Sequence, residues 1–233
     1  MEKLTSTKQM FKIVFPSLTI AVVFLLLTGF LVHNPSSVQL RVIVLLDETD
    51  SFPYWDDAKQ HIYQIIDNLN SGDEFELIAI DDKGYQTEDV RIPFEKIDQS
   101  FLKARQQKNR IIGKVKVLAR RKNKYKATDI LGSLRYAASD SKGYNTRIIC
   151  FSDMEQYPPP KTNNEIKLEF SQDTKAYFIV NSVGEEDWNR KVSIWKPIIE
   201  RSGLQFTSEG PHANFIAYTN SNIRLPEILK EWR

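Results

Sequence analysis

The 233-residue chain has few cysteines, histidines and methionines, and no large excess of charge of either sign. Its single cysteine, Cys150, cannot form an internal disulfide, and it lies in an apolar run where a buried thiol is expected. The three histidines are scattered and show no metal-binding pattern. The formal net charge is only +2, so composition gives no reason to expect a nucleic-acid partner.

Long uncharged stretches are also missing, with one exception near the N-terminus. Residues 13–32 carry no charged side chain, and about 20 helical residues are enough to cross a hydrocarbon core of roughly 30 Å. A cleaved signal peptide is the alternative, but its apolar core is normally shorter. Leu31-Val32-His33-Asn34 also offers no small-x-small cleavage site. The stretch is therefore predicted to be a retained transmembrane helix.

The distribution of basic residues predicts how this helix is oriented. Three lysines precede it, and no Lys or Arg follows it before Arg41. The positive-inside rule then places residues 1–12 in the cytoplasm and the main domain on the extracytoplasmic side. We expect a single-pass membrane protein in which a short linker, residues 33–40, leads into one domain, residues 41–233.

Strand and helix patterns alternate along this domain. Apolar runs predict strands at 42–46, 75–80, 147–151 and 176–180, with shorter strands at 204–206 and 215–218. Helical spacing of apolar residues predicts helices at 55–69, 128–138 and 189–202, followed by a small C-terminal helix bearing Ile228, Leu229 and Trp232. Pro93 confines an alternating segment around residues 90–94 to a sheet edge. The predicted fold is α/β, with a doubly wound, mostly parallel sheet and one antiparallel edge strand.

The segment at about 100–126 is strongly basic. Apolar residues at helical spacing within it predict an amphipathic helix: Ile111, Ile112, Val115, Leu118 and Ala119. Such a helix is either a solvated surface helix covering the sheet, or a surface for anionic lipid headgroups or an acidic partner. Its basic residues are not interleaved with aromatic ones, so it does not form a stacking platform for single-stranded nucleic acid.

Oxygen-bearing side chains follow the first predicted strand at alternate positions. Asp47, Thr49 and Ser51 come directly after the buried run 42–46. In open α/β sheets ligands bind beyond the carboxyl ends of the strands, and a tight turn there brings the three side chains together. Carboxylate and hydroxyl oxygens suit a hard divalent cation. The stretch therefore indicates a metal site.

Two later segments have the same character, Thr128-Asp129 at a helix start and Ser152-Asp153 after a strand. The ordered set resembles the von Willebrand factor type A family and its metal-ion-dependent adhesion site, written Asp-x-Ser-x-Ser with a Thr and an Asp on later loops. The resemblance covers about residues 41–218, including segments 69–75 and 198–206. It implies that Thr49 and Ser51 bind the metal directly, that Asp47 and Asp153 bind it or hold its waters, and that Thr128 binds directly or through water.

Two departures from the family pattern accompany this resemblance. Thr49 replaces the usual first Ser and preserves its hydroxyl, whereas Met154 stands where a Gly often follows the Asp. The second departure leaves open a displaced third loop and a displaced Asp153. Simpler roles are also open: Thr128 as the N-cap of its helix, and the Asp residues as turn formers.

Few charged ligands leave a bound Mg²⁺ underneutralised, so it favours one more carboxylate. The resemblance likewise implies that a partner protein supplies it, giving a recognition site and not an enzyme. Asp50 adds charge at the rim and could favour Mn²⁺ or Ca²⁺.

The alternative is an Mg²⁺-dependent phosphohydrolase. Asp-x-Thr-x-Ser after a buried strand also resembles the phosphorylation loop of the haloacid dehalogenase superfamily, in which Asp47 would be the nucleophile. That family needs a phosphate-binding Lys and a later acidic pair. Ser152-Asp153 supplies one acid, but no Gly-Asp-x-x-x-Asp loop is found near it.

Overall fold

The computed structural model describes residues 39–81, 89–119, 128–157 and 168–218, which belong to one compact unit, Val38–Arg233. Its centre is a six-stranded sheet in the order β3-β2-β1-β4-β5-β6. The strands are β1 (Leu40–Asp47), β2 (Glu74–Ile80), β3 (Val90–Lys96), β4 (Asn145–Ser152), β5 (Lys175–Val180) and β6 (Phe215–Ala217). All neighbouring strands are parallel except β2 and β3. The predicted mostly parallel sheet with one antiparallel edge strand is confirmed.

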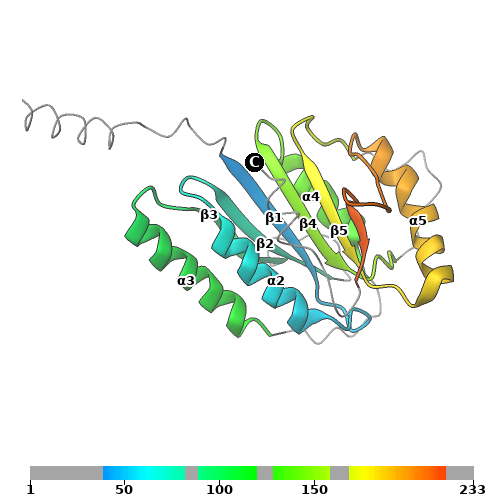
Figure 1. Ribbon diagram of the computed structural model, residues 1–233, viewed down its shortest axis with the longest axis horizontal. Coiled ribbons are helices and arrows are strands. Elements are labelled where there is room, and N and C mark those ends of the chain that lie inside the picture. The colour runs from blue at the N-terminus through cyan, green and yellow to red at the C-terminus, as the bar shows by residue number, and fades with distance from the viewer. Residues whose placement is uncertain (1–38, 82–88, 120–127, 158–167, 219–233) are drawn as a thin grey trace, which may run out of the picture. The chain divides into compact units, whose positions relative to one another are not determined.

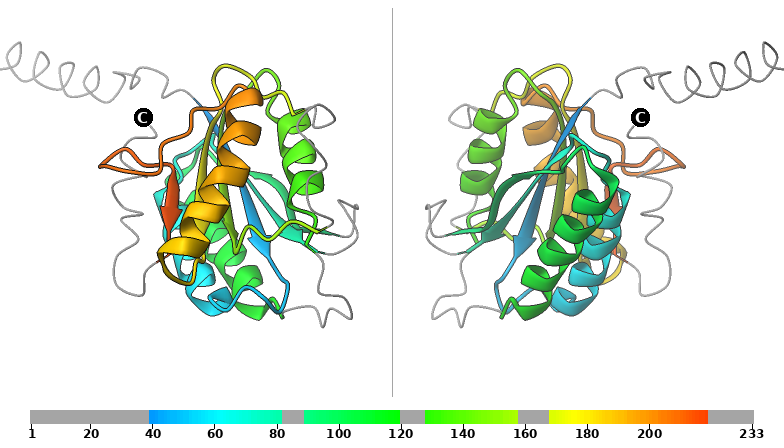
Figure 2. Two further views of the ribbon diagram at one scale, coloured as in Figure 1. Left: turned by 90° about the vertical axis from the view of Figure 1, so that its right-hand side faces the viewer. Right: turned by 90° about the vertical axis from the view of Figure 1, so that its left-hand side faces the viewer.

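Helices cover both faces of this sheet (Figures 1 and 2). The helices α2 (Trp55–Asn68) and α3 (Phe101–Val117) lie on one face, and α4 (Ile130–Asp140) and α5 (Gly184–Arg201) on the other. Alternation along β1 explains why it is apolar throughout. Val42, Val44 and Leu46 enter the core beneath α2 and α3, whereas Ile43 and Leu45 enter the core beneath α4 and α5. Because β1 is packed on both faces, its last residue, Asp47, has a fixed position at the end of the sheet.

A Gly-Asp turn before β2 stabilises the end of the sheet at which the parallel strands begin, here called the amino edge. Gly72 has φ +91°, and a Cβ there would meet the side chains of Gln39 and Gln99 at 3.1 Å. The buried Asp73 accepts hydrogen bonds from the amide of Leu40 (3.1 Å, Oδ1) and from the amide of Asn70 (2.6 Å, Oδ2). The start of β1 is therefore held by the turn that introduces its neighbour.

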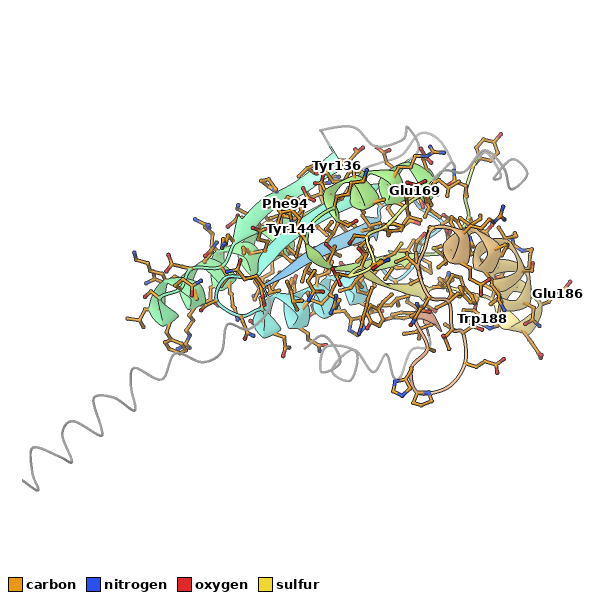
Figure 3. All side chains as sticks on the ribbon, turned by 90° about the horizontal axis from the view of Figure 1, so that it is seen from above. Phe94, Tyr136, Tyr144, Glu169, Glu186 and Trp188 are labelled. Carbon is orange, nitrogen blue, oxygen red and sulfur yellow. The ribbon has the colours of Figure 1, made fainter. Side chains whose placement is uncertain are left out.

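Arg41 reinforces the same edge on the α4 side. Its guanidinium lies over the rings of Phe94 and Tyr144, 4.3 and 3.2 Å from the ring centroids, and donates to Glu74 Oε2 at 2.7 and 2.9 Å. Figure 3 shows Phe94 and Tyr144 close together with Tyr136, far from Glu186 and Trp188 on α5. One cation thus joins β1, β2, β3 and the turn before β4.

The amphipathic character of α3 is confirmed over its described length. Ile111 and Val115 are fully buried against the sheet. Two of its basic residues, Arg110 and Lys114, each approach Glu95 of β3 at 2.5 Å. Part of the basic surface therefore fastens the helix to the edge strand. The remainder of the predicted segment, 120–126, lies outside the described residues.

The predictions for the C-terminal third were less accurate. The helix α5 begins at Gly184, five residues before the predicted start at Asn189, and contains Pro197. The predicted strand at 204–206 is wrong: the carbonyl of Gln205 accepts from the side chain of Asn214 (2.7 Å) instead of from a strand. The strand predicted at 215–218 is confirmed as β6. The expected C-terminal helix lies outside the described residues.

The predicted membrane span, residues 13–32, also lies outside the described part of the chain. Within the part that is described, every helix is too short or too polar to cross a bilayer.

Candidate metal centre

Asp47 is the last residue of β1, and its side chain is fully buried. Oδ1 accepts hydrogen bonds from the Thr49 amide (2.9 Å) and the Thr49 hydroxyl (2.6 Å). Oδ2 accepts from the Ser152 hydroxyl at 2.6 Å, across the junction between β1 and β4. The tight turn expected after β1 is therefore present, and Asp47 organises both the first and the third loop.

The three predicted hydroxyl groups lie together in front of Asp47. Ser51 Oγ lies 2.9 Å from Thr49 Oγ1, and Thr128 Oγ1 lies 3.4 Å from the same atom. Because Thr49 donates its proton to Asp47, it accepts from both neighbours. Residues separated by 79 positions in the chain thus form one row of hydroxyl oxygens.

Thr128 does not cap its helix. The N-cap of α4 is Asp129, whose Oδ1 accepts from the Gly132 amide at 3.0 Å. The Asp129 amide in turn donates to the carbonyl of Asp81 at 2.7 Å, which fixes this loop against the end of β2. The capping role considered for Thr128 is therefore wrong, and its hydroxyl is turned to Thr49 instead.

Asp153 follows β4, and its two oxygens differ. Oδ1 accepts from the Glu155 amide at 2.9 Å. Oδ2 is buried and accepts no hydrogen bond from any described residue. Burial raises the pKa of this carboxyl, and the nearby Ser51 hydroxyl only partly opposes that shift. A buried carboxylate oxygen without a donor is costly unless a cation or another proton donor compensates it.

Met154 takes the place of a glycine in conformation as well as in sequence. Its φ of +58° lies in the left-handed region, which glycine enters readily and other residues rarely. Two contacts hold it there: its amide donates to Ser152 Oγ (2.9 Å), and its carbonyl accepts from Trp195 Nε1 (2.9 Å). The third loop is thus held between β4 and α5, and Asp153 lies near enough to Asp47 to raise the pKa of that carboxyl.

The two carboxyl groups repel each other in a buried setting. Burial, with Asp153 as a second cause, raises the pKa of Asp47 from 3.8 to about 7, against the hydrogen bonds from Ser152 and Thr49. Burial also raises the pKa of Asp153, and its hydrogen bonds and Lys191 oppose that shift. Lys191 supplies little compensation because its ammonium group also lies 2.9 Å from Asp187 Oδ2. The centre is short of positive charge.

This donor set fits a hard cation better than a soft one. It comprises two carboxylates and three hydroxyls, without sulfur or imidazole. Nowhere in the described ranges do three His, Cys, Asp or Glu side chains converge as a metal-binding group, so any cation here depends on the hydroxyls. All five residues predicted for the site, Asp47, Thr49, Ser51, Thr128 and Asp153, come from the same edge of the sheet.

Sequence reasoning missed two residues that hold this arrangement, Ser152 and Trp195. The Ser152 hydroxyl bridges Asp47 and the Met154 amide, and Trp195 fastens α5 to the third loop. The Ser152-Asp153 pair was a visible signal for the first. No sequence signal distinguishes Trp195 from an ordinary core tryptophan.

No family model matches the chain, and no curated protein sequence matches it significantly. Among solved structures, proximal thread matrix protein 1 from the mussel byssus is similar with a TM-score of 0.51 and 15% identity, over 84% of this chain and 47% of that chain. A von Willebrand factor type A protein from Catenulispora acidiphila has a TM-score of 0.49 and 13% identity, over 84% and 41%. Manganese-loaded TRAP protein from Plasmodium vivax has a TM-score of 0.45 and 14% identity, over 82% and 72%.

Identities this low concern the fold alone, and the chain spans about half the length of the byssus protein. The strand order, the antiparallel edge strand and the helices on both faces define a mixed α/β domain with a doubly wound, mostly parallel sheet, and the similarity to the byssus protein concerns this fold.

Proposed function

We propose that the domain binds a divalent cation at the carboxyl edge of its sheet and uses it to recruit an acidic side chain of another protein. The observation that carries this proposal is Asp153 Oδ2, a buried carboxylate oxygen without a hydrogen-bond donor among the described residues. It stands beside a second buried carboxyl, Asp47, and a row of hydroxyls. Mg²⁺ suits this set best, and Mn²⁺ or Ca²⁺ are close substitutes.

The hydrogen bonds give the two carboxylates different roles in the proposed site. Both oxygens of Asp47 already accept from Thr49 and Ser152, so Asp47 orients hydroxyl ligands and waters more readily than it binds the ion. Asp153 keeps one oxygen for direct binding. Thr49, Ser51 and Thr128 are neutral ligands. A divalent ion held in this way keeps positive charge and attracts a further carboxylate, which a partner protein can present.

We also propose that the chain is held in a membrane by residues 13–32, with the domain on the extracytoplasmic side. The support is the uncharged stretch and the asymmetry of the flanking lysines. A tethered domain that carries a cation site at the carboxyl edge of its sheet suits adhesion or the assembly of an envelope structure.

A melting experiment on the full chain in detergent tests the metal site. Adding Mg²⁺ or Mn²⁺ at a hundred times its Kd is expected to stabilise the domain by about 2.7 kcal/mol, which raises Tm by roughly 5–10 °C. Asp153→Asn removes this increment. Asp56→Asn is the matched control, because it deletes an exposed carboxylate in the first turn of α2 and keeps the increment. An unchanged Tm on addition of EDTA to the metal-loaded protein contradicts the proposal.

The partner is tested by retention of membrane proteins on immobilised chain. We expect proteins that bind in Mg²⁺ and elute with EDTA, and that fail to bind the Asp153→Asn variant. The same proteins binding equally well in EDTA would separate partner recognition from the cation.

The phosphohydrolase alternative is less consistent with the geometry. A nucleophilic Asp47 needs an oxygen open to substrate, but its side chain is fully buried and both oxygens accept hydrogen bonds. Turnover of a general phosphatase substrate in Mg²⁺, lost in Asp47→Asn, would establish that alternative.

A further inference from the structure

The amino edge of the sheet carries a surface that the cation site does not explain. At the start of α3, Phe101 and Leu102 are 76% and 70% exposed, and the basic residues Lys103 and Arg105 beside them are exposed as well. We call these four residues the basal patch. Neither Lys103 nor Arg105 forms an ion pair with another described residue, in contrast to Arg110 and Lys114 further along the helix. Exposed large apolar side chains beside unpaired cations are typical of a surface that meets lipid headgroups.

The basal patch lies at the end of the domain where the chain enters from its N-terminal side. The amide of Ile97, four residues before α3, donates to the carbonyl of Asp73 at 2.8 Å. Asp73 in turn accepts from the amide of Leu40, the first residue of β1. The start of α3 and the start of β1 are therefore held at the same edge of the sheet, as Figure 1 also shows.

Chain length places this edge near a bilayer if the predicted span is retained. Leu40 follows Val32, the end of the span, by eight residues, which reach at most about 28 Å when fully extended. The domain therefore cannot move far from the surface, and its amino edge is the part tethered closest to it. We propose that the basal patch rests on anionic lipid headgroups, with Phe101 and Leu102 entering the interface and Lys103 and Arg105 binding phosphate.

Charge at the opposite edge favours the same orientation. The carboxyl edge exposes acidic residues on the loop after β1, at the start of α2 and at the start of α5: Asp50, Asp56, Asp57, Glu185 and Glu186. Anionic headgroups repel this edge while they attract the basal patch. The domain would then stand with its candidate cation site facing away from the bilayer, where a partner can reach it.

Two thiol-specific spin labels test the orientation in the full chain. Cys150 is fully buried, so a cysteine placed on the surface is the reactive thiol of the folded domain. Phe101→Cys reports on the basal patch. Val183→Cys is the matched control, because Val183 is 82% exposed and follows β5 at the carboxyl edge. Both variants are placed in nanodiscs of phosphatidylcholine alone or with phosphatidylglycerol, in EDTA so that the outcome is independent of the cation site.

In phosphatidylglycerol discs we expect the label at 101 to lose accessibility to a water-soluble nickel relaxant and to gain accessibility to oxygen. The label at 183 should be equally accessible in both discs. Two basic residues near an anionic surface favour contact by roughly thirty-fold, so Lys103→Glu with Arg105→Glu should return the label at 101 to the accessibility of the label at 183.

Three results would overturn the proposal. Equal accessibility of the two labels in phosphatidylglycerol discs excludes contact with the bilayer. Protection at 101 that persists in phosphatidylcholine discs and in the charge-reversed variant indicates that a second copy of the chain covers the patch. Failure of the full chain to enter discs removes the tether on which the inference rests.

Discussion

Removing the charge of Asp47 is expected to stabilise the metal-free domain at neutral and alkaline pH. The pKa of this carboxyl is about 7 in the folded chain and 3.8 for an ordinary Asp. Between those pH values the folded chain holds a proton that the unfolded chain has released, so the free energy of unfolding falls as pH rises. Above pH 7 the destabilisation is complete and amounts to about 4 kcal/mol. Asp47→Asn cannot ionise and avoids it.

The substitution also has a cost. The amide nitrogen of an asparagine would replace one oxygen of Asp47, most simply Oδ2, which accepts from the Ser152 hydroxyl. Ser152 must then reorient while it still accepts from the Met154 amide, at a cost of about 1–2 kcal/mol. The variant should therefore be more stable than the wild type by about 2–3 kcal/mol at pH 8. It should be less stable by about 1–2 kcal/mol near pH 3, where Asp47 is mostly protonated in both the folded and the unfolded chain.

Urea unfolding in EDTA across pH 3–8.5 measures the pH at which the stabilities of the two proteins cross. Glu76 on β2 also has a pKa raised to about 7, chiefly by burial, and it contributes a pH slope of its own. That slope is common to both proteins and cancels in their difference. Excess Mg²⁺ at pH 8 should restore the wild type and leave the variant unchanged. A stability difference that is constant with pH would refute the reasoning, because it would mean that Asp47 has an ordinary pKa in the folded chain.

Two further predictions concern the loops around the site. Met154→Ala should destabilise the domain by about 2–5 kcal/mol, because a buried side chain is lost. Met154→Gly should cost about 1 kcal/mol less despite its smaller side chain, because glycine accepts a φ of +58°. A higher Tm for the Ala variant than for the Gly variant would contradict the strained backbone. Ser152→Ala should cost about 1–3 kcal/mol in urea unfolding, because the Met154 amide loses its acceptor and Asp47 loses a donor; a neutral effect would show that water replaces both bonds.

The regular elements of the first half could be predicted because burial leaves a visible pattern: a continuous apolar run in a strand that is covered on both faces, and helical spacing of apolar residues in a helix that is covered on one. The predicted strand at 75–80 and helix at 55–69 match β2 and α2 to within one residue at each end. Prediction was poorer where a buried residue does not belong to a regular element, or where a helix begins with exposed polar residues. The first turn of α5 is acidic, which hid its start at Gly184. Leu204 is buried like a strand residue, but a loop holds it.

In the candidate site, residues that lie close together in the sequence could be predicted, whereas contacts between distant segments could not. Asp47, Thr49 and Ser51 form a contiguous motif after an apolar run, so they could be found by reading along the chain. The cap at Asp129 could not be assigned, because Thr128 is also a good capping residue, and the folded chain alone shows the Gly132 amide donating to Asp129 while the Thr128 hydroxyl faces Thr49. The conformation of Met154 was also hidden, since no methionine signals a left-handed backbone.

The bond from Ser152 to Asp47 joins residues 105 positions apart. No short peptide cut from this chain can therefore reproduce the oxygens of the proposed cation site, and a cation that binds here would report that β1 and β4 are paired in register. Metal titration would then serve as a readout of complete folding, one that a partly collapsed chain with intact helices could not imitate.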